Sequence, residues 1–250
     1  MVACIVPWNY PLLLMAWKVA PAIAAGNSVI IKPAEQTPLA TLACAGIFGV
    51  LPEGVVNIVT GLGETAGDAL VRHPGVDMVA FTGSLEVGKH IGKTCMDRMI
   101  KVHLELGGKD PFVVAEDADL DVAAKAVAWA AFLNTGQVCT STERVYVQKT
   151  VFPEFLDKLT AFTKTLTLGP GLDPETDIGP MIGGEYRARV DAHVQEAIKA
   201  GATLVTGGRK PEKFKKGWYY EPTILTGVDR TMRVMREETF GPVCPVTPYK

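Results

Sequence analysis

Three polar side chains, a thiol, a carboxylate and an amide, stand in sequence settings that suit reaction chemistry. Cys139 follows Gly136-Gln137-Val138, between an apolar run with helical spacing and a β-branched run with strand spacing. A side chain at such a junction can face a cleft, and a cysteine thiolate is a strong nucleophile. Packing explains most isolated cysteines, so the thiol alone leaves both interpretations open.

Glu105 stands near the end of an alternating apolar run, Val102–Leu106, which directly precedes Gly107-Gly108. We expect its carboxylate at the mouth of a buried strand, where burial is costly without a partner and makes a carboxylate a better base. The two glycines permit close approach of backbone or ligand.

Asn9 lies between Trp8 and Tyr10 and is flanked by Pro7 and Pro11. A rigid amide packed by aromatic rings is a suitable hydrogen-bond donor to a developing oxyanion. An ordinary turn asparagine is the alternative interpretation.

Two further stretches suit a nucleotide. Phe81-Thr82-Gly83-Ser84 ends a strand and opens a helix, where backbone N–H groups attract a diphosphate, although serine is equally a favoured N-cap. Lys32 and Glu35 stand at another strand end, where nucleotides bind in open parallel sheets. A carboxylate there can accept from an adenosine 2′-hydroxyl and would repel a 2′-phosphate, whereas a solvated Lys/Glu pair is the alternative.

Strand-like and helix-like runs must position these side chains, and they alternate along the first part of the chain. This alternation is typical of βαβ units and predicts a parallel sheet. The predicted strands are Ala3–Val6, Ser28–Ile31, Val55–Val59, Met78–Phe81 and Lys101–Leu106, and the predicted helices are Leu12–Ala24, Pro38–Gly49, Thr65–Arg72 and Val87–Cys95.

The α/β pattern continues after a boundary that we place near Gly107-Gly108. Residues 1–108 and 109–250 are therefore predicted to be two domains. The predicted strands of the second are Pro111–Ala115, 144–148, 203–206, 223–225 and Val243–Lys250, and its predicted helices are 122–133, 151–166 and 183–200.

Composition excludes several classes of protein. A net charge of -2 offers no basic excess for nucleic acid. The most apolar stretch, Pro11–Ala25, contains Lys18 and Pro21, so we expect a buried helix and not a membrane span. The 5 cysteines are scattered without paired spacing, which favours reduced thiols, a cytoplasmic location and no zinc site. No histidine or carboxylate pattern indicates another metal site.

Six stretches form a set that runs along essentially the whole chain. They are Pro7–Pro11, Lys32–Pro38, Phe81–Ser84, Glu105–Lys109, Gly136–Cys139 and Glu237–Pro242. In their order and spacing they resemble the signature stretches of the NAD(P)-dependent aldehyde dehydrogenase superfamily. Each stretch alone is unspecific, but the six together are highly specific.

The resemblance implies a Rossmann-like parallel-sheet cofactor domain over residues 1–108 and a second α/β catalytic domain over 109–250. It implies that Cys139 attacks an aldehyde, that Asn9 and the Cys139 N–H hold the oxyanion, and that hydride passes to NAD. Glu105 would activate the water that hydrolyses the resulting thioester, and Lys18 matches a lysine proposed for proton relay.

Further roles are carried over by position. Lys32 and Glu35 match residues on the adenosine ribose, Glu238 matches the acid on the nicotinamide ribose, and Tyr10, Leu14 and Trp17 match an aldehyde tunnel. The full implied cofactor set is Val6, Pro7, Trp8, Lys32, Pro33, Ala34, Glu35, Gly83, Ser84, Leu85, Glu86, Gly107, Glu238 and Phe240. NAD is expected, with NADP possible. A small-molecule aldehyde is the expected partner, without nucleic acid or membrane.

Family members have further regions before the first and after the last of these stretches. We therefore expect a fragment truncated at both ends, from a full-length protein that forms a homo-oligomer, a dimer or a tetramer. Two alternatives stay open. One is a CoA-acylating relative, against which Glu105 argues, and the other is an inactive truncated relative acting as a binding or structural protein.

Overall fold

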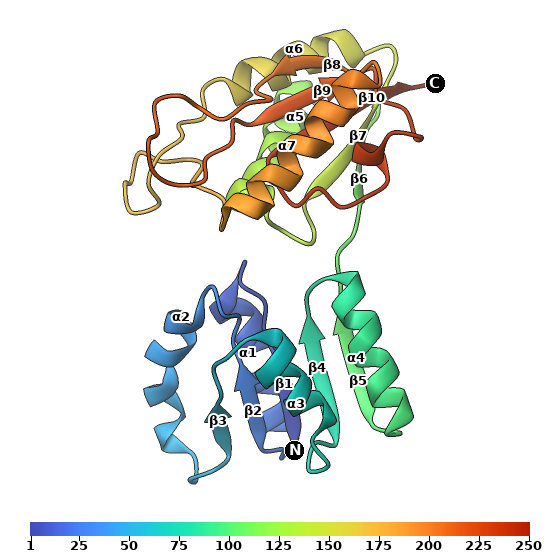
Figure 1. Cartoon of the computed structure of the whole chain (residues 1–250). Helices are drawn as coiled ribbons and strands as arrows, with labels where there is room; N and C mark the ends of the chain where they lie inside the picture. The colour runs from blue at the N-terminus through green and yellow to red at the C-terminus, as the bar shows by residue number, and fades with distance from the viewer. The chain divides into compact units, whose positions relative to one another are not determined.

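The computed structural model describes residues 1–250 and divides the chain into two compact units, Met1–Gly107 and Gly108–Lys250 (Figure 1). Each unit is built on one five-stranded sheet with helices on both faces. The predicted α/β fold class is therefore confirmed. No helix is both long and apolar enough to cross a bilayer.

The sheet of the first unit is entirely parallel, in the order β3-β2-β1-β4-β5. Its strands are β1 (Val2–Ile5), β2 (Val29–Lys32), β3 (Val56–Ile58), β4 (Met78–Thr82) and β5 (Lys101–Glu105). Strand order runs outward from β1 in one direction to β3 and in the other to β5. The connections therefore diverge between β1 and β4, the switch point at which open α/β sheets bind nucleotides.

Helices cover both faces of this sheet because β1 is apolar on both of its sides. Cys4 packs in one cluster with Leu14 of α1, whereas Ala3 packs in another with Val71 of α3 and Ile91 of α4. The helical segments are α1 (Pro11–Ala24), α2 (Pro38–Ala43), η1 (Ala45–Val50), η2 (Gly63–Gly67), α3 (Asp68–Arg72) and α4 (Leu85–Asp97).

The sheet of the second unit is mixed, in the order β6-β7-β10-β9-β8. Its strands are β6 (Asp110–Val114), β7 (Thr142–Gln148), β8 (Thr203–Thr206), β9 (Thr223–Thr226) and β10 (Val243–Tyr249). Only β8 is antiparallel, to β9. The two strands can run antiparallel because a loop, and not a helical crossover, joins β8 to β9.

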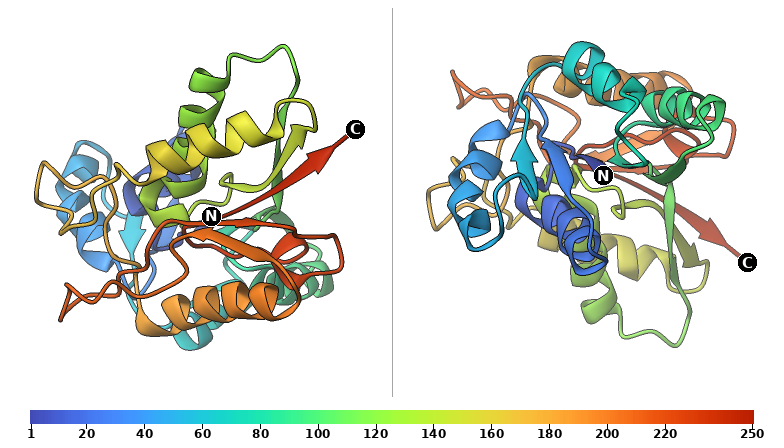
Figure 2. Two further views of the ribbon diagram at one scale, coloured as in Figure 1. Left: turned by 90° about the horizontal axis from the view of Figure 1, so that it is seen from above. Right: turned by 90° about the horizontal axis from the view of Figure 1, so that it is seen from below.

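Figure 2 shows α5 and α6 on one side of this sheet and α7 on the other. Val127 of α5 and Leu159 of α6 pack against Val145 in one cluster, and Val194 of α7 packs against Leu225 in the other. The helical segments are α5 (Leu120–Phe132), η3 (Leu133–Gly136), α6 (Phe152–Thr163), α7 (Gly184–Lys199) and η4 (Arg233–Met235).

The predicted helices differ from the observed ones mainly at their ends. The helix expected over Pro38–Gly49 divides at Cys44 into α2 and the 3-10 segment η1. The buried helix that we expected, α1, is buried on one side only, since Leu13 is 45% and Trp17 65% exposed. Its apolar residues surround the helix, but only one side faces the sheet.

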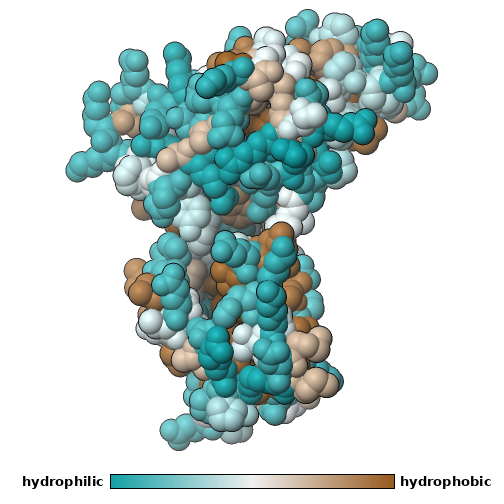
Figure 3. Space-filling model, turned by 45° about the vertical axis from the view of Figure 1, so that its right-hand side comes forward, coloured by the Kyte–Doolittle hydropathy of each residue, from teal (hydrophilic) through white to brown (hydrophobic).

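Exposed apolar residues such as these are interspersed with polar ones. On the face shown in Figure 3, hydrophilic residues predominate between separate apolar patches.

Gly88 lets α4 lie close to the end of β5. A Cβ at Gly88 would stand 2.4 Å from Cδ2 and 3.4 Å from Cγ of Leu106, whereas one at Gly92, a turn later, would stand 3.5 Å from Leu104. The absence of a side chain therefore matters at Gly88 and not at Gly92.

We expect Gly88→Ala to destabilise the first unit by about 1 kcal/mol or more, because overpacking outweighs the gain in helix propensity. Gly92→Ala, the matched control, should stabilise the unit by about 0.5–1 kcal/mol. Urea unfolding followed by circular dichroism measures both. Equal effects of the two substitutions would contradict the packing argument.

Candidate active site

The predicted cofactor residues of the first unit lie at one edge of its sheet. Because the strands are parallel, the segments that follow β1, β2 and β4 all leave at the carboxyl ends of the strands. These segments carry Val6-Pro7-Trp8, Pro33-Ala34-Glu35 and Gly83-Ser84. The topology therefore gathers residues that are far apart in the sequence.

Lys32 and Glu35 form an ion pair at the end of β2. Lys32 is 3% exposed, and its Nζ lies 3.0 Å from Oε2 of Glu35, whose side chain is 40% exposed. Burial alone would raise the pKa of Glu35, but a backbone hydrogen bond and the Lys32 ammonium together bring it below its usual range. Glu35 is therefore ionised and anchored, with part of its carboxylate open to a ligand.

Ser84 is the N-cap of α4, since its hydroxyl accepts a hydrogen bond of 3.3 Å from the Val87 N–H. A hydroxyl that accepts can still donate its own hydrogen. Ser84 therefore both caps the helix and stands at its positive end, where an anion is favoured.

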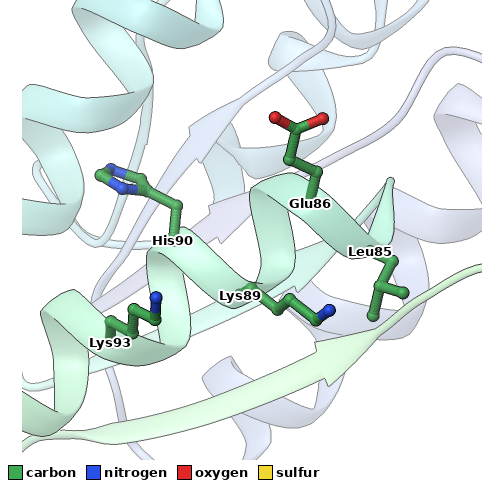
Figure 4. A pocket seen from close by; sticks show the side chains of 5 residues that line it. All are labelled: Leu85, Glu86, Lys89, His90 and Lys93. Carbon is green, nitrogen blue, oxygen red and sulfur yellow. The ribbon is translucent and has the colours of Figure 1, made fainter.

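An open pocket runs along α4 from this terminus. It is lined by Leu85, Glu86, Lys89, His90 and Lys93 (Figure 4). Figure 4 shows Glu86 and His90 projecting from one side of the helix and Leu85 and Lys89 from another. His90 Nε2 lies 2.7 Å from Asp68 of α3, which ties the two helices together.

Asn9 and Tyr10 lie half-buried in the turn between β1 and α1, which Pro11 begins. On α1, Leu14 is buried in the core of the unit and Lys18 donates to the Thr82 hydroxyl at the end of β4. Trp17 lies on the exposed side of the same helix. Lys18 therefore joins α1 to the strand that leads into the Gly83-Ser84 turn.

Glu105 is not buried, and this expectation was wrong. Its side chain is 62% exposed and Oε1 lies 3.2 Å from Nε2 of His103. The physical reason is that β5 is an edge strand of the sheet, so that Lys101, His103 and Glu105 alternate outward along it. Gly107 ends the first unit two residues after this strand.

In the second unit, a left-handed backbone turn leads to Cys139. Asn134, Thr135 and Gly136 have φ angles of 50°, 61° and 68°. A β-branched residue such as Thr135 rarely adopts this conformation, so the surroundings must hold it. The Thr135 hydroxyl donates to the Gly179 carbonyl at 3.0 Å, and Gln137 accepts from Ile182 N–H at 2.9 Å.

The loop before Cys139 packs directly on the loop that follows η4. A Cβ at Gly136 would stand 2.1 Å from the Gly241 carbonyl oxygen, and one at Gly241 would stand 2.3 Å from Val190 of α7. The two backbones therefore touch with no side chain between them. This contact joins the stretches Gly136–Cys139 and Glu237–Pro242.

Glu238 lies within electrostatic range of the Cys139 thiol. Burial raises the pKa of Cys139 above its usual value, N–H groups lower it, and the Glu238 and Asp110 carboxylates raise it further. Burial and the Glu143 carboxylate raise the pKa of Glu238 to about 7. The Gly108 N–H, Arg189 and Lys109 lower this pKa by a smaller amount. The Gly108 N–H donates to Glu238 Oε1 at 3.4 Å.

Comparison with known proteins matches the sequence pattern of the aldehyde dehydrogenase family over residues 1–250. The chain is 44% identical to a phenylacetaldehyde dehydrogenase of Pseudomonas fluorescens, over 99% of this chain and 50% of that protein. The chain belongs to the aldehyde dehydrogenase family. It spans about half the length of the curated relatives it matches.

Two further relatives of this chain are named for betaine aldehyde, and the structure of one of them is a complex with NAD+. A betaine aldehyde dehydrogenase of Bacillus subtilis is 43% identical over 98% of this chain and 51% of its own. The structure of a betaine aldehyde dehydrogenase from Staphylococcus aureus, in complex with NAD+, has a TM-score of 0.97 and 39% identity, over 100% of this chain and 50% of its own.

The structure gathers the predicted residues of this family member in two groups. Asn9, Lys18 and Glu105 belong to the first unit, together with all the predicted cofactor and tunnel residues except two. Glu238 and Phe240 belong to the second unit with Cys139.

Sequence reasoning missed the buried polar residues that contact the loop after Glu238. Glu143 is 4% exposed and forms an ion pair with Lys109. His193 is 1% exposed, and its Nδ1 lies 3.5 Å from the Thr239 hydroxyl. The one available signal was Glu143-Arg144, two charged residues at the start of an otherwise apolar strand-like run.

Substitution of Gly136 should disrupt the Cys139 loop. Gly136→Ala adds a backbone clash to the strain of a left-handed alanine, whereas Gly227→Ala, at φ 65°, adds the strain alone because the nearest atom would be 3.7 Å away. We expect Gly227→Ala to cost about 1–2 kcal/mol and Gly136→Ala at least twice as much. Urea unfolding measures both, and equal losses would contradict the close contact with Gly241.

The second unit should lose stability in acid because of His193. Burial, with the charges of Arg233, Lys109 and Arg189, lowers the pKa of His193 from 6.5 to about 4. Between these values the unfolded chain binds a proton that the folded chain does not, so the stability contribution is complete above pH 6.5 and is lost as pH falls toward 4.

We expect His193→Gln to remove on the order of 3 kcal/mol of this pH dependence. The measurement is the urea midpoint between pH 7 and 4. His73→Gln, at an exposed position, is the control and should leave the wild-type slope. A wild-type slope in the His193 variant would contradict the argument.

Proposed function

We propose that the protein oxidises an aldehyde to a carboxylic acid with NAD+, with Cys139 as the nucleophile. The observation that carries the proposal is the setting of Cys139. A strained, tightly packed loop leads to its half-buried thiol, whose pKa the Glu238 carboxylate raises, and a packing cysteine needs no such loop. Family membership and the names of the relatives support the same reaction.

In the proposed reaction, the Cys139 sulfur attacks the aldehyde carbon and forms a thiohemiacetal. The Asn9 amide and the Cys139 backbone N–H donate to the oxyanion that develops. Because the pKa of the Cys139 thiol lies above its usual value, a base must take the proton for attack at neutral pH. Loss of hydride from the substrate carbon then leaves a thioester on Cys139.

The residues at the carboxyl edge of the first sheet suit NAD+. Lys32 and Glu35 would hold the adenosine ribose, and the capped start of α4 at Gly83–Glu86 would take the diphosphate. Glu238 and Phe240 would lie at the nicotinamide end. NAD+, when bound, supplies the acceptor for the hydride. The Glu35 carboxylate would repel the 2′-phosphate of NADP.

Glu105 is proposed to activate the water that hydrolyses the thioester. Its exposed position on an edge strand gives water direct access to the carboxylate. The presence of this carboxylate favours hydrolysis over transfer of the acyl group to CoA. Lys18, which is buried and bonded to Thr82, is proposed to take part in proton relay.

Tyr10, Leu14 and Trp17 are proposed to contribute to the path of the aldehyde. We further propose that the full-length protein forms a homo-oligomer and works in the cytoplasm, where its 5 free cysteines stay reduced.

Cys139→Ala should abolish NADH formation from an aldehyde panel and leave NAD+ binding intact, because it removes the nucleophile alone. NADH absorbance and a fluorescence titration with NAD+ measure the two properties. Cys44→Ala, which removes the other half-buried thiol, is the control and should keep wild-type turnover. Unchanged turnover in the Cys139 variant would refute the proposal.

The fate of the acyl group can be separated in the same assay. Glu105→Gln should give one rapid equivalent of NADH and then slow turnover, because acylation is intact and hydrolysis is impaired. A requirement for CoA in the wild type would favour the acylating alternative. NAD+ binding without any turnover would favour a binding protein.

A further inference from the structure

Glu143 occupies a β-bulge four residues after Cys139. Asp110 pairs with Thr142 and the next residue, Pro111, pairs with Arg144, so Glu143 is the extra residue of β7. A bulge breaks the alternation of a strand and can turn a side chain to the other face. Thr142 and Glu143 are accordingly buried in succession, at 6% and 4% exposure.

The Glu143 carboxylate binds the backbone of the loop that carries Glu238. The Thr239 N–H lies 3.0 and 2.9 Å from its two oxygens, and the Phe240 N–H lies 3.0 Å from Oε1. Lys109 Nζ donates to the same carboxylate and, at 3.1 Å, to the Thr239 hydroxyl. Phe240 has a φ of 53°, a conformation that needs such support.

The Glu143 carboxylate therefore accepts hydrogen bonds from three donors, the Thr239 N–H, the Phe240 N–H and the Lys109 ammonium. A buried carboxylate is costly unless it is fully bonded, so the loop amides and the ammonium explain its presence. The consequence for the loop is equally direct, because the residue before Thr239 is Glu238. Glu238 Oε1 accepts from the Gly108 N–H at 3.4 Å, and a Cβ at Gly108 would stand 3.5 Å from the Cys139 carbonyl oxygen, so the carboxylate lies close to Cys139.

We propose that Glu143 is a positioning residue that holds the 238–240 loop in place and thereby sets the distance of the Glu238 carboxylate from the Cys139 thiol. The proposal rests on the proposed function only for its kinetic consequence. Its structural part can be tested on the thiol itself.

Alkylation of Cys139 against pH provides a readout that a purely structural role would not move. Glu238 and Asp110 are the carboxylates whose charges act on the thiol, and both raise its pKa. If Glu143→Gln releases the loop, Glu238 leaves the thiol and the alkylation midpoint falls. If the loop stays, the midpoint does not fall, because Glu238, with a pKa of about 7, is already ionised beside Cys139 where the thiol titrates.

The experiment compares the wild-type chain with E143Q, E238Q and the double variant, using iodoacetamide and peptide mass spectrometry to resolve Cys139 from the other cysteines. We expect E143Q to lower the midpoint by about one pH unit. E238Q should give a similar shift, and the double variant should give no further one, because both act on the same carboxylate.

Val147→Ala is the matched control, because it removes buried volume from the same strand without touching the loop. It should lower the unfolding temperature and leave the alkylation midpoint unchanged. If E143Q does not fold, E143D repeats the test, since it keeps the charge and withdraws the carboxylate by one methylene. A midpoint that rises or stays constant in the folded variant overturns the proposal.

The kinetic consequence separates this proposal from the proposed function. In an active enzyme, E143Q should raise KM for NAD+ about ten-fold with a smaller change in kcat, since Glu238 and Phe240 would be displaced. An inactive chain with the expected alkylation shift would retain the role of Glu143 and contradict the proposed function alone.

Discussion

The second unit depends on the burial of one negative charge. Glu143 is held at the edge of the core by the Lys109 ammonium and by two backbone N–H groups. A charge in such a place is tolerated only when its partners are fixed. The start of β6, the bulge of β7 and the loop before β10 are therefore constrained together. The direct contact between Gly136 and Gly241 adds the Cys139 loop to the same assembly.

The two units position their polar groups by different physical means. In the first, regular elements suffice, because strand ends, a capped helix and the Lys32–Glu35 pair follow from the topology of a parallel sheet. In the second, the backbone leaves the regular regions at Asn134, Thr135 and Phe240. Strain of this kind persists only where packing and hydrogen bonds outweigh it.

Local sequence patterns predicted most of the fold, because they report directly on single elements. Ser84 illustrates this, since it caps α4 through the N–H group of Val87, as a serine between a strand and a helix suggests. Features that depend on how the strands pair were harder to predict from the sequence. The exposure of Glu105 follows from the edge position of β5, and the burial of Glu143 follows from a bulge. Neither strand order nor register is written in a single run of residues.

The position of β10 has a consequence for how the second sheet can assemble during translation. β10 pairs with β7 on one side and β9 on the other, although it is the last of these strands to be synthesised. Until it leaves the ribosome, the sheet consists of two separate pieces whose inner edges are unpaired. Such edges invite wrong association. The second sheet is therefore most exposed to wrong pairing after β9 has been made and before β10 joins it.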